Sequence, residues 1–188
     1  IFLFIFAILM AAKAARWVLV VLSLLVMMLA WGRNFMPLTE FFHNFVPLYN
    51  KFRVPSMILV VFQLIMPFAA VLVVDRLLKG EVQLAKPVIV KRLLWATIAT
   101  AGLSLLFALV PSLAGDFVSR HDAQYPGLMA DALRIDRVAL LRADALRSML
   151  FILAAAAVIL FTLKGKLKQR YSILALGLLI LVDLWSVD

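Results

Sequence analysis

Hydrophobic residues are distributed along this chain in long runs that short clusters of charged residues separate. Such runs predict membrane-spanning helices, because only helices and closed barrels satisfy every backbone polar group inside a lipid bilayer. The fold class expected is all-α: a polytopic transmembrane helical bundle of about six spans, with no β-sheet. In chain order, the predicted spans cover residues 1–12, 17–31, 56–74, 93–110, 149–163 and 171–185.

The first hydrophobic run is shorter than a complete span. Residues 1–10 would form about 15 Å of helix, which is about half of the ~30 Å hydrocarbon core. The chain also opens inside this run, on Ile1, and ends at Asp188 directly after another run. We therefore expect residues 1–188 to be an interior part of a longer polypeptide and a single transmembrane helical domain, with its first span truncated.

Composition agrees with a membrane protein and excludes some kinds of site. Hydrophobic residues make up 66% of the chain and charged residues 15%, whereas a soluble domain has about a quarter of its residues charged. The chain has no cysteine, which excludes disulfides and thiolate metal sites. Its formal net charge of +9 is interpreted as a signal of membrane topology, and nucleic acid is not an expected partner.

Charge is divided unevenly between the predicted loops. The first, third and fifth loops together carry 11 basic and 2 acidic residues, whereas the second and fourth carry 8 basic and 6 acidic residues. The positive-inside rule places the first set in the cytoplasm. In a bacterium, this arrangement predicts a multi-pass protein of the inner (cytoplasmic) membrane, with residues 32–55 and 111–148 on the outer side.

The two outer segments differ in composition, and we expect interfacial helices in both. In residues 32–55, aromatic and polar side chains alternate, and three prolines divide the segment into short pieces. Aromatic rings favour the lipid boundary, so this segment is predicted to lie at the membrane surface. In the other segment, residues 131–147 lack Pro and Gly and should form a helix, with ion pairs Asp131/Arg134 and Asp144/Arg147.

Cationic residues of the outer segments are the candidate ligands for a lipid phosphate. Lys51 and Arg53 stand just before the third span, where they either anchor the helix to headgroups or bind phosphate, to which the planar fork of Arg is suited. Within residues 131–147, Arg137 or Arg142 has the same two interpretations, a salt bridge or a phosphate contact. The candidate lipid-phosphate-binding residues are Arg53, Lys51, Arg33, His43 and Arg137.

Other motifs that would indicate catalysis are missing from the sequence. It contains no Gly-rich phosphate loop, nucleophile elbow or metal signature. The chain has two histidines, without a pair at ligand spacing, so a zinc site is not expected. No predicted span carries a buried pair of ionisable residues, which leaves a proton relay unsupported. The residues therefore identify neither a catalytic group nor a cofactor.

Two stretches resemble a known family. Asn-Phe-Met-Pro-Leu-Thr-Glu-Phe-Phe, at 34–42, and Val-Pro-Leu-Tyr-Asn-Lys-Phe-Arg-Val-Pro-Ser-Met, at 46–57, are similar to the middle of the YfhO family of bacterial membrane proteins, in the versions found in Bacteroidetes. Asp-Ala-Leu-Arg-Ser at 144–148 and Asp-Leu-Trp-Ser-Val-Asp at 183–188 agree with it. The resemblance covers most of the chain.

The resemblance implies a function in the cell envelope. The YfhO family is similar to the GT-C glycosyltransferases, which take a sugar from a polyprenyl-phosphate carrier at the outer leaflet to modify envelope glycans or lipids. Its members are several times longer than this chain, and by analogy their catalytic carboxylate lies in the first outer loop, outside residues 1–188. Glu40 is the nearest acid here, and it is not expected to take that role.

Whether the chain belongs to an enzyme remains open at this point. The alternative is a non-catalytic membrane scaffold or subunit that binds an envelope partner through its outer loops, and a transporter of a polyprenyl-linked glycan has the least support. The expected partners are membrane lipids, a polyprenyl-phosphate sugar, and the rest of the chain's own polypeptide or other membrane subunits.

Overall fold

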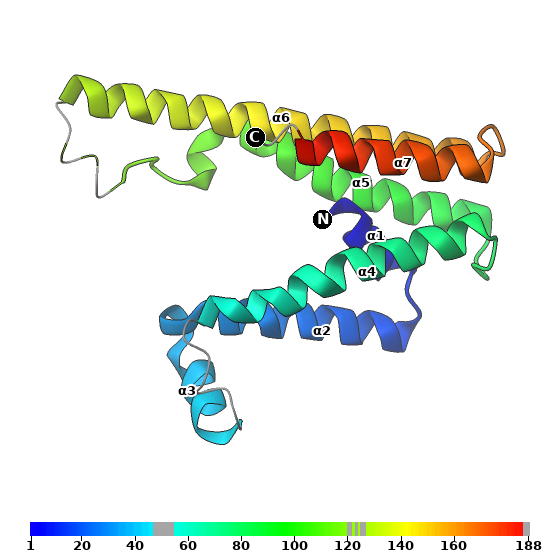
Figure 1. Cartoon of the computed structure of the whole chain (residues 1–188), viewed down its shortest axis with the longest axis horizontal. Coiled ribbons are helices and arrows are strands. Elements are labelled where there is room, and N and C mark those ends of the chain that lie inside the picture. The colour runs from blue at the N-terminus through cyan, green and yellow to red at the C-terminus, as the bar shows by residue number, and fades with distance from the viewer. Residues whose placement is uncertain (47–54, 120–121, 123, 125–126, 186–188) are drawn as a thin grey trace. The chain divides into compact units, whose positions relative to one another are not determined.

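The computed structural model describes residues 1–46, 55–119, 122, 124 and 127–185 (Figure 1). Every regular element in these residues is a helix, and they contain no β-strand. The predicted all-α class is thus confirmed for the part of the chain that is described. Contacts between Cα atoms divide the chain into two compact units, Leu3–Gln83 and Leu84–Asp188.

The first unit contains two long antiparallel helices and four short elements. The long helices are α2 (Lys13–Ala30) and α4 (Leu59–Leu78), and α2 also packs against the 3₁₀ turn η3 (Pro55–Ile58) that leads into α4. Before α2 comes α1 (Phe2–Met10), and after it come the 3₁₀ turn η1 (Gly32–Phe35) and the helix α3 (Met36–Phe45).

Arg16 ties the end of α1 to the start of α2. Its guanidinium donates hydrogen bonds to the carbonyl oxygens of Ile8, Leu9 and Ala11, at 3.0 to 3.1 Å. The last carbonyls of a helix have no partner within that helix, so this side chain caps the C-terminus of α1. Arg16 therefore has a structural role in addition to the positive charge by which it contributes to the predicted topology.

The second unit is built around one long helix. It comprises α5 (Lys86–Leu109), the 3₁₀ turn η4 (Pro111–Ala114), α6 (Gly127–Leu163) and α7 (Gln169–Trp185). The most extensive packing joins α5 to α6, and α7 packs on α6 as well. Small buried residues such as Ala96, Thr100 and Ala156 allow close approach between helices, as is typical of membrane proteins.

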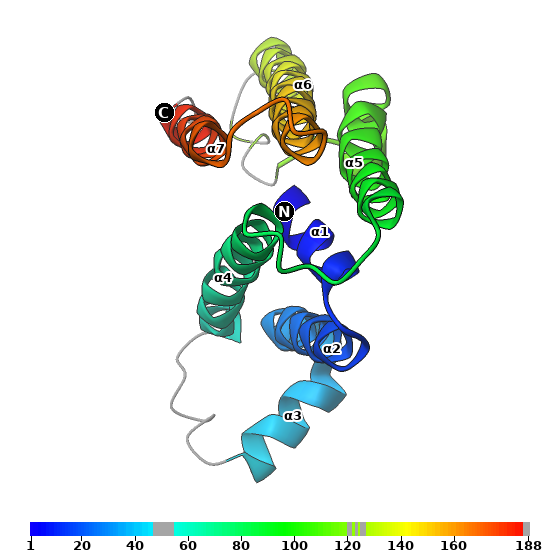
Figure 2. The same cartoon turned by 90° about the vertical axis from the view of Figure 1, so that its right-hand side faces the viewer.

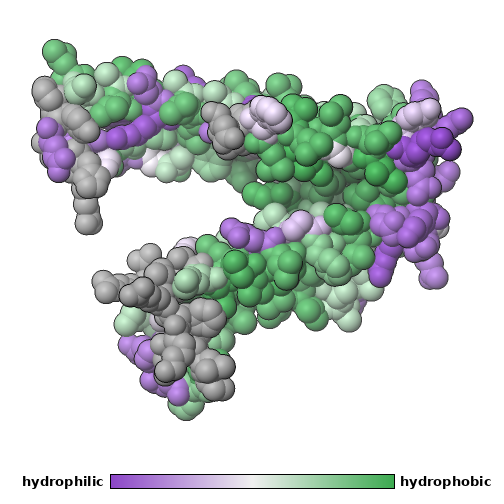
Figure 3. All heavy atoms as spheres, viewed as in Figure 1, coloured by the Kyte–Doolittle hydropathy of each residue, from purple (hydrophilic) through white to green (hydrophobic). Residues whose placement is uncertain are grey.

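Four helices in the described residues are long and apolar enough to cross a membrane: α2, α4, α5 and α6. The chain is therefore a membrane protein with transmembrane helices. The predicted count of about six spans is not confirmed, because α1 has 9 residues and α7 has 17. On the face seen in Figure 3, hydrophobic residues cover the lengths of helices and hydrophilic residues gather near their ends.

The largest departures from the predicted helix boundaries are in α5 and α6. The span expected at 93–110 begins at Lys86, because Pro87 in the first turn suits a helix start. The interfacial helix expected at 131–147 is no separate element, since it continues into the span expected at 149–163 as α6. No Pro or Gly interrupts residues 128–163, so nothing in the sequence ends the helix between them.

The length of α6 implies that part of it extends beyond the hydrocarbon core. Its 37 residues correspond to roughly 55 Å of helix, against a core of roughly 30 Å. The second half, from Met149 to Leu163, is almost entirely apolar, whereas the first half contains the alternating Asp and Arg residues. The first half of α6 is thus the part suited to the aqueous side.

Candidate functional site

A polar cluster joins the first half of α6 to the segment that precedes it. The Arg137 guanidinium donates two hydrogen bonds to the Asp122 carboxylate, Nη1 to Oδ2 and Nη2 to Oδ1, each of 2.7 Å. This bidentate geometry is the strong form of an Arg–carboxylate pair. We call the cluster of Arg137, Asp122, Phe117 and Ser119 the α6 clamp.

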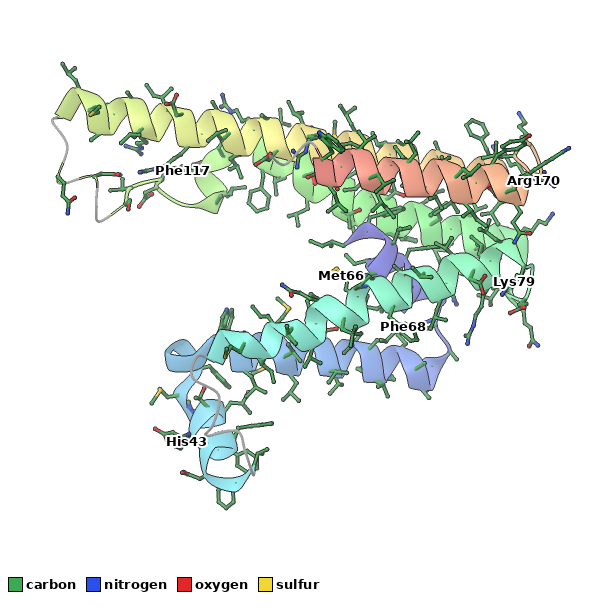
Figure 4. All side chains as sticks on the ribbon, viewed as in Figure 1. His43, Met66, Phe68, Lys79, Phe117 and Arg170 are labelled. Atoms are coloured by element: carbon green, nitrogen blue, oxygen red, sulfur yellow. The ribbon has the colours of Figure 1, made fainter. Side chains whose placement is uncertain are left out.

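Two backbone groups complete the α6 clamp. Arg137 Nη1 also donates to the carbonyl oxygen of Phe117 at 2.8 Å, and the Ser119 N–H donates to Asp122 Oδ2 at 2.7 Å. Phe117, labelled in Figure 4, has a positive φ of 56°, in the left-handed region that residues other than Gly rarely adopt. The clamp offsets the cost of this backbone conformation and holds the segment on α6.

The α6 clamp leaves little of its carboxylate in contact with solvent. The Asp122 side chain is 10% exposed and that of Arg137 is 34% exposed. A buried carboxylate needs partners for its oxygens, and both Asp122 oxygens have them here. An external phosphate would have to displace Asp122 to use the fork of Arg137, so the salt-bridge interpretation of Arg137 fits the geometry better.

Of the ion pairs predicted for residues 131–147, one is observed. Arg147 lies 3.8 Å from Asp144, and it also lies 3.8 Å from Asp183 of α7. Within the described residues no ion pair joins Asp131 to Arg134 at 4.0 Å or less. The observed pairs show that Arg147 connects α6 to α7.

The cationic candidates of residues 32–55 are described in part. Lys51 and Arg53 lie outside the described residues, and so does the side chain of Arg33, whose backbone is part of η1. His43 is exposed on α3 (Figure 4). His43 and Arg137 therefore lie in different units, and no placement of one relative to the other follows.

The helix α3 carries three of the aromatic rings of this segment. Phe41 lies edge-on to Phe42, with ring centroids 5.8 Å apart, and the centroids of Phe41 and Phe45 are 5.1 Å apart. The hydroxyl of Thr39 donates to the carbonyl oxygens of Gly32 and Phe35, at 3.0 and 3.2 Å. These bonds fix α3 to the turn that follows α2.

Comparisons of the chain with protein-family models, curated proteins and solved structures find no match. In the described residues, no three His, Asp or Glu side chains are grouped so that they could hold a metal ion. The chemistry that the chain can support is therefore argued from its own residues.

The α6 clamp was not anticipated from the sequence. Asp122 and Arg137 are 15 residues apart, so no helical spacing relates them. The signal available in the sequence is the turn expected around Asp122, before Tyr125-Pro126-Gly127. The sequence does not identify Arg137 as the partner of Asp122, because that pairing depends on where the segment before α6 lies along the helix.

Proposed function

We propose that this chain is the membrane-embedded part of a GT-C-like glycosyltransferase that uses a polyprenyl-phosphate-linked sugar at the outer leaflet of the bacterial inner membrane. One observation carries the proposal. In the first unit, α3 and the start of α4 lie at one end of the α2–α4 pair, whereas Lys13, Arg76 and Lys79 lie at the other. The aromatic segment and the strongly basic loops thus belong to opposite ends.

The chemistry of a carrier-bound sugar suits the aromatic end. Transfer leaves a phosphate whose charge grows in the transition state, and cations stabilise such a group. Lys51 and Arg53 stand just before η3 and α4 in the sequence, and the N-terminus of a helix favours an anion. The carboxylate that would activate the acceptor is expected in another part of a longer polypeptide.

Substitution of Arg53 in the full-length protein tests this function. A bidentate, charge-assisted contact is worth about 1.5–3 kcal/mol, so Arg53→Ala should weaken carrier-lipid binding and transfer roughly 10- to 100-fold. Arg53→Lys keeps the charge but loses the fork, and its loss should be intermediate. Arg134→Ala, at an exposed position on α6, is the matched control. Wild-type binding and transfer in Arg53→Ala would refute the proposal.

A second candidate is a non-catalytic scaffold that binds an envelope partner. The observation that favours it is the α6 clamp, in which a polar cluster is satisfied by the chain itself while apolar side chains on the same half of α6, such as Leu128 and Ile135, are exposed. Under this alternative Ile135→Glu would release the partner, and Arg53→Ala would leave glycan transfer unchanged.

A further inference from the structure

The helix α3 separates apolar from polar side chains around its axis. Leu38, Phe41, Phe42 and Phe45 follow one another at the spacing i, i+3, i+4 and i+7, which places them on one face of a helix. Thr39, Glu40, His43 and Asn44 occupy the opposite face, together with Met36 and Pro37 of the first turn. In ten residues, α3 thus has an aromatic face and a polar face.

Two of the rings on the aromatic face, those of Phe41 and Phe45, are largely exposed. No residue of α3 is buried, and the side chains of Phe41 and Phe45 are 53% and 72% exposed. The rings contact one another, which shields a small part of their surface. A continuous apolar face of this kind on a short helix calls for an apolar environment to cover it.

The connection to α2 determines which environment lies within reach. α2 is a candidate span whose last turn is followed by the exposed Trp31, a residue typical of the membrane–water interface. Four residues of 3₁₀ turn then lead into α3, a path of ~8 Å at about 2 Å per residue. The headgroup layer is roughly 5–7 Å thick on each side of the core, so this path ends within the layer or at its outer edge.

The direction of α3 keeps the helix near that level. In both views, α3 runs across the axis of α2 rather than continuing along it (Figures 1 and 2). If α2 crosses the bilayer, a helix that runs across it lies roughly in the plane of the membrane. His43 projects from the side of α3 that is turned away from the length of α2 (Figure 4), as expected when the polar face is directed to water.

We infer that α3 is an interfacial helix whose aromatic face is buried among lipid acyl chains at the headgroup boundary, with its polar face in the headgroups. The occupant of the aromatic face is therefore the lipid bilayer itself. Glu40 is the one formally charged residue of α3 at neutral pH, so burial of apolar surface rather than attraction to anionic lipid holds the helix in place. This inference does not depend on the proposed function.

Labelling of single cysteines can test the orientation of α3, because the natural chain has no cysteine. Phe41→Cys and Phe45→Cys sample the aromatic face, and Glu40→Cys and His43→Cys sample the polar face. A nitroxide is attached to the cysteine of each variant of the full chain, and the labelled protein is reconstituted into phosphatidylcholine vesicles. Accessibility to oxygen, which concentrates in acyl chains, and to a water-soluble nickel chelate is then measured at every position.

The expected result is two opposite profiles along α3. Oxygen accessibility should be highest at 41 and 45, and nickel accessibility highest at 40 and 43, with the 3.6-residue period of a helix. Replacing part of the lipid by phosphatidylglycerol should leave both profiles unchanged. Leu38→Cys and Asn44→Cys give a second pair on the same two faces if one of the first variants does not fold.

Two outcomes would overturn the inference. High nickel accessibility at all four positions would place α3 in water, away from the bilayer. Low accessibility to both reagents at 41 and 45 would show that protein, rather than lipid, covers the aromatic face. Because transfer activity is not measured, neither outcome can be confused with failure of the glycosyltransferase proposal.

Discussion

The two segments predicted to face outward, 32–55 and 111–148, handle their polar groups in different ways. In the first, α3 exposes His43 and Glu40 on a helix without a buried residue. In the second, the α6 clamp closes Arg137 and Asp122 on each other through two 2.7 Å hydrogen bonds. One segment therefore presents its polar side chains to the surroundings, and the other uses them to hold its own backbone.

This difference separates charges that build the structure from charges that are available to a ligand. Arg137 and Arg53 are the same residue type in segments predicted to lie on the same side, and a phosphate contact was one interpretation of each. The carboxylate of Asp122 satisfies the fork of Arg137 within the chain. A search for ligand-binding cations is thus better directed to residues 32–55 than to α6.

The prediction with the largest effect concerns topology, on which the comparison depends. With single cysteines at His43 and Arg134, a membrane-impermeant thiol reagent should label intact cells. A cysteine at Lys166, in the loop between α6 and α7, should be labelled after the membrane is opened. The positive-inside rule is the physical reason, and the expected contrast is all or none.

The control for this labelling is each variant in permeabilised cells, where all three cysteines should react. Labelling of the cysteine at Lys166 in intact cells, with protection of the one at Arg134, would reverse the assigned orientation. Both segments would then lie on the cytoplasmic side, and the comparison of two outer segments would no longer hold.

Breaking the α6 clamp should have the next largest effect. Asp122→Ala removes a bidentate pair and leaves Arg137 without its carboxylate. Since the Arg137 side chain is about one-third exposed, water compensates in part for the lost pair, and we expect a partial loss of local stability rather than unfolding of the unit. Hydrogen–deuterium exchange of residues 113–119 in nanodiscs should report the release of this segment from α6.

A matched substitution distinguishes the clamp from a general effect of charge. Asp116→Ala removes an exposed acid from the same segment and should leave exchange close to the wild-type rate. Arg137→Lys should give an intermediate increase, since Lys keeps the charge and loses the fork. If Asp122→Ala and Asp116→Ala exchange alike, the clamp does not stabilise the segment.

Local sequence patterns predicted the fold better than they predicted the site. Long apolar runs identified the helices, and α3 ends at Phe45, where Val46 has the extended conformation favoured before Pro47. The α6 clamp and the Arg16 cap were missed because each joins residues of two different elements, and the path of the chain between those elements decides which residues meet. Pairing of this kind carries no period in the sequence, unlike the pair of Asp144 and Arg147.

The smallest predicted effect concerns a polar contact between α6 and α7, at the end of the second unit opposite the clamp. Ser172 of α7 is fully buried, and its hydroxyl lies 2.6 Å from that of Thr162 in α6. Thr162 also donates to the Val158 carbonyl oxygen at 2.7 Å, so it keeps a partner when Ser172 is replaced. Ser172→Ala should therefore cost about 0.6 kcal/mol, the typical value for a hydrogen bond between membrane helices.

The matched control for Ser172→Ala is Ser104→Ala, in which the lost hydroxyl is bonded within its own helix, to the Thr100 carbonyl oxygen at 3.1 Å. Thermal unfolding of Ser172→Ala, Thr162→Val and the double variant Ser172→Ala/Thr162→Val, measured in the same detergent, isolates the contact between α6 and α7 by a double-mutant cycle. A coupling energy near zero would mean that packing alone joins these helices, and that the clamp end is where polar contacts organise the second unit.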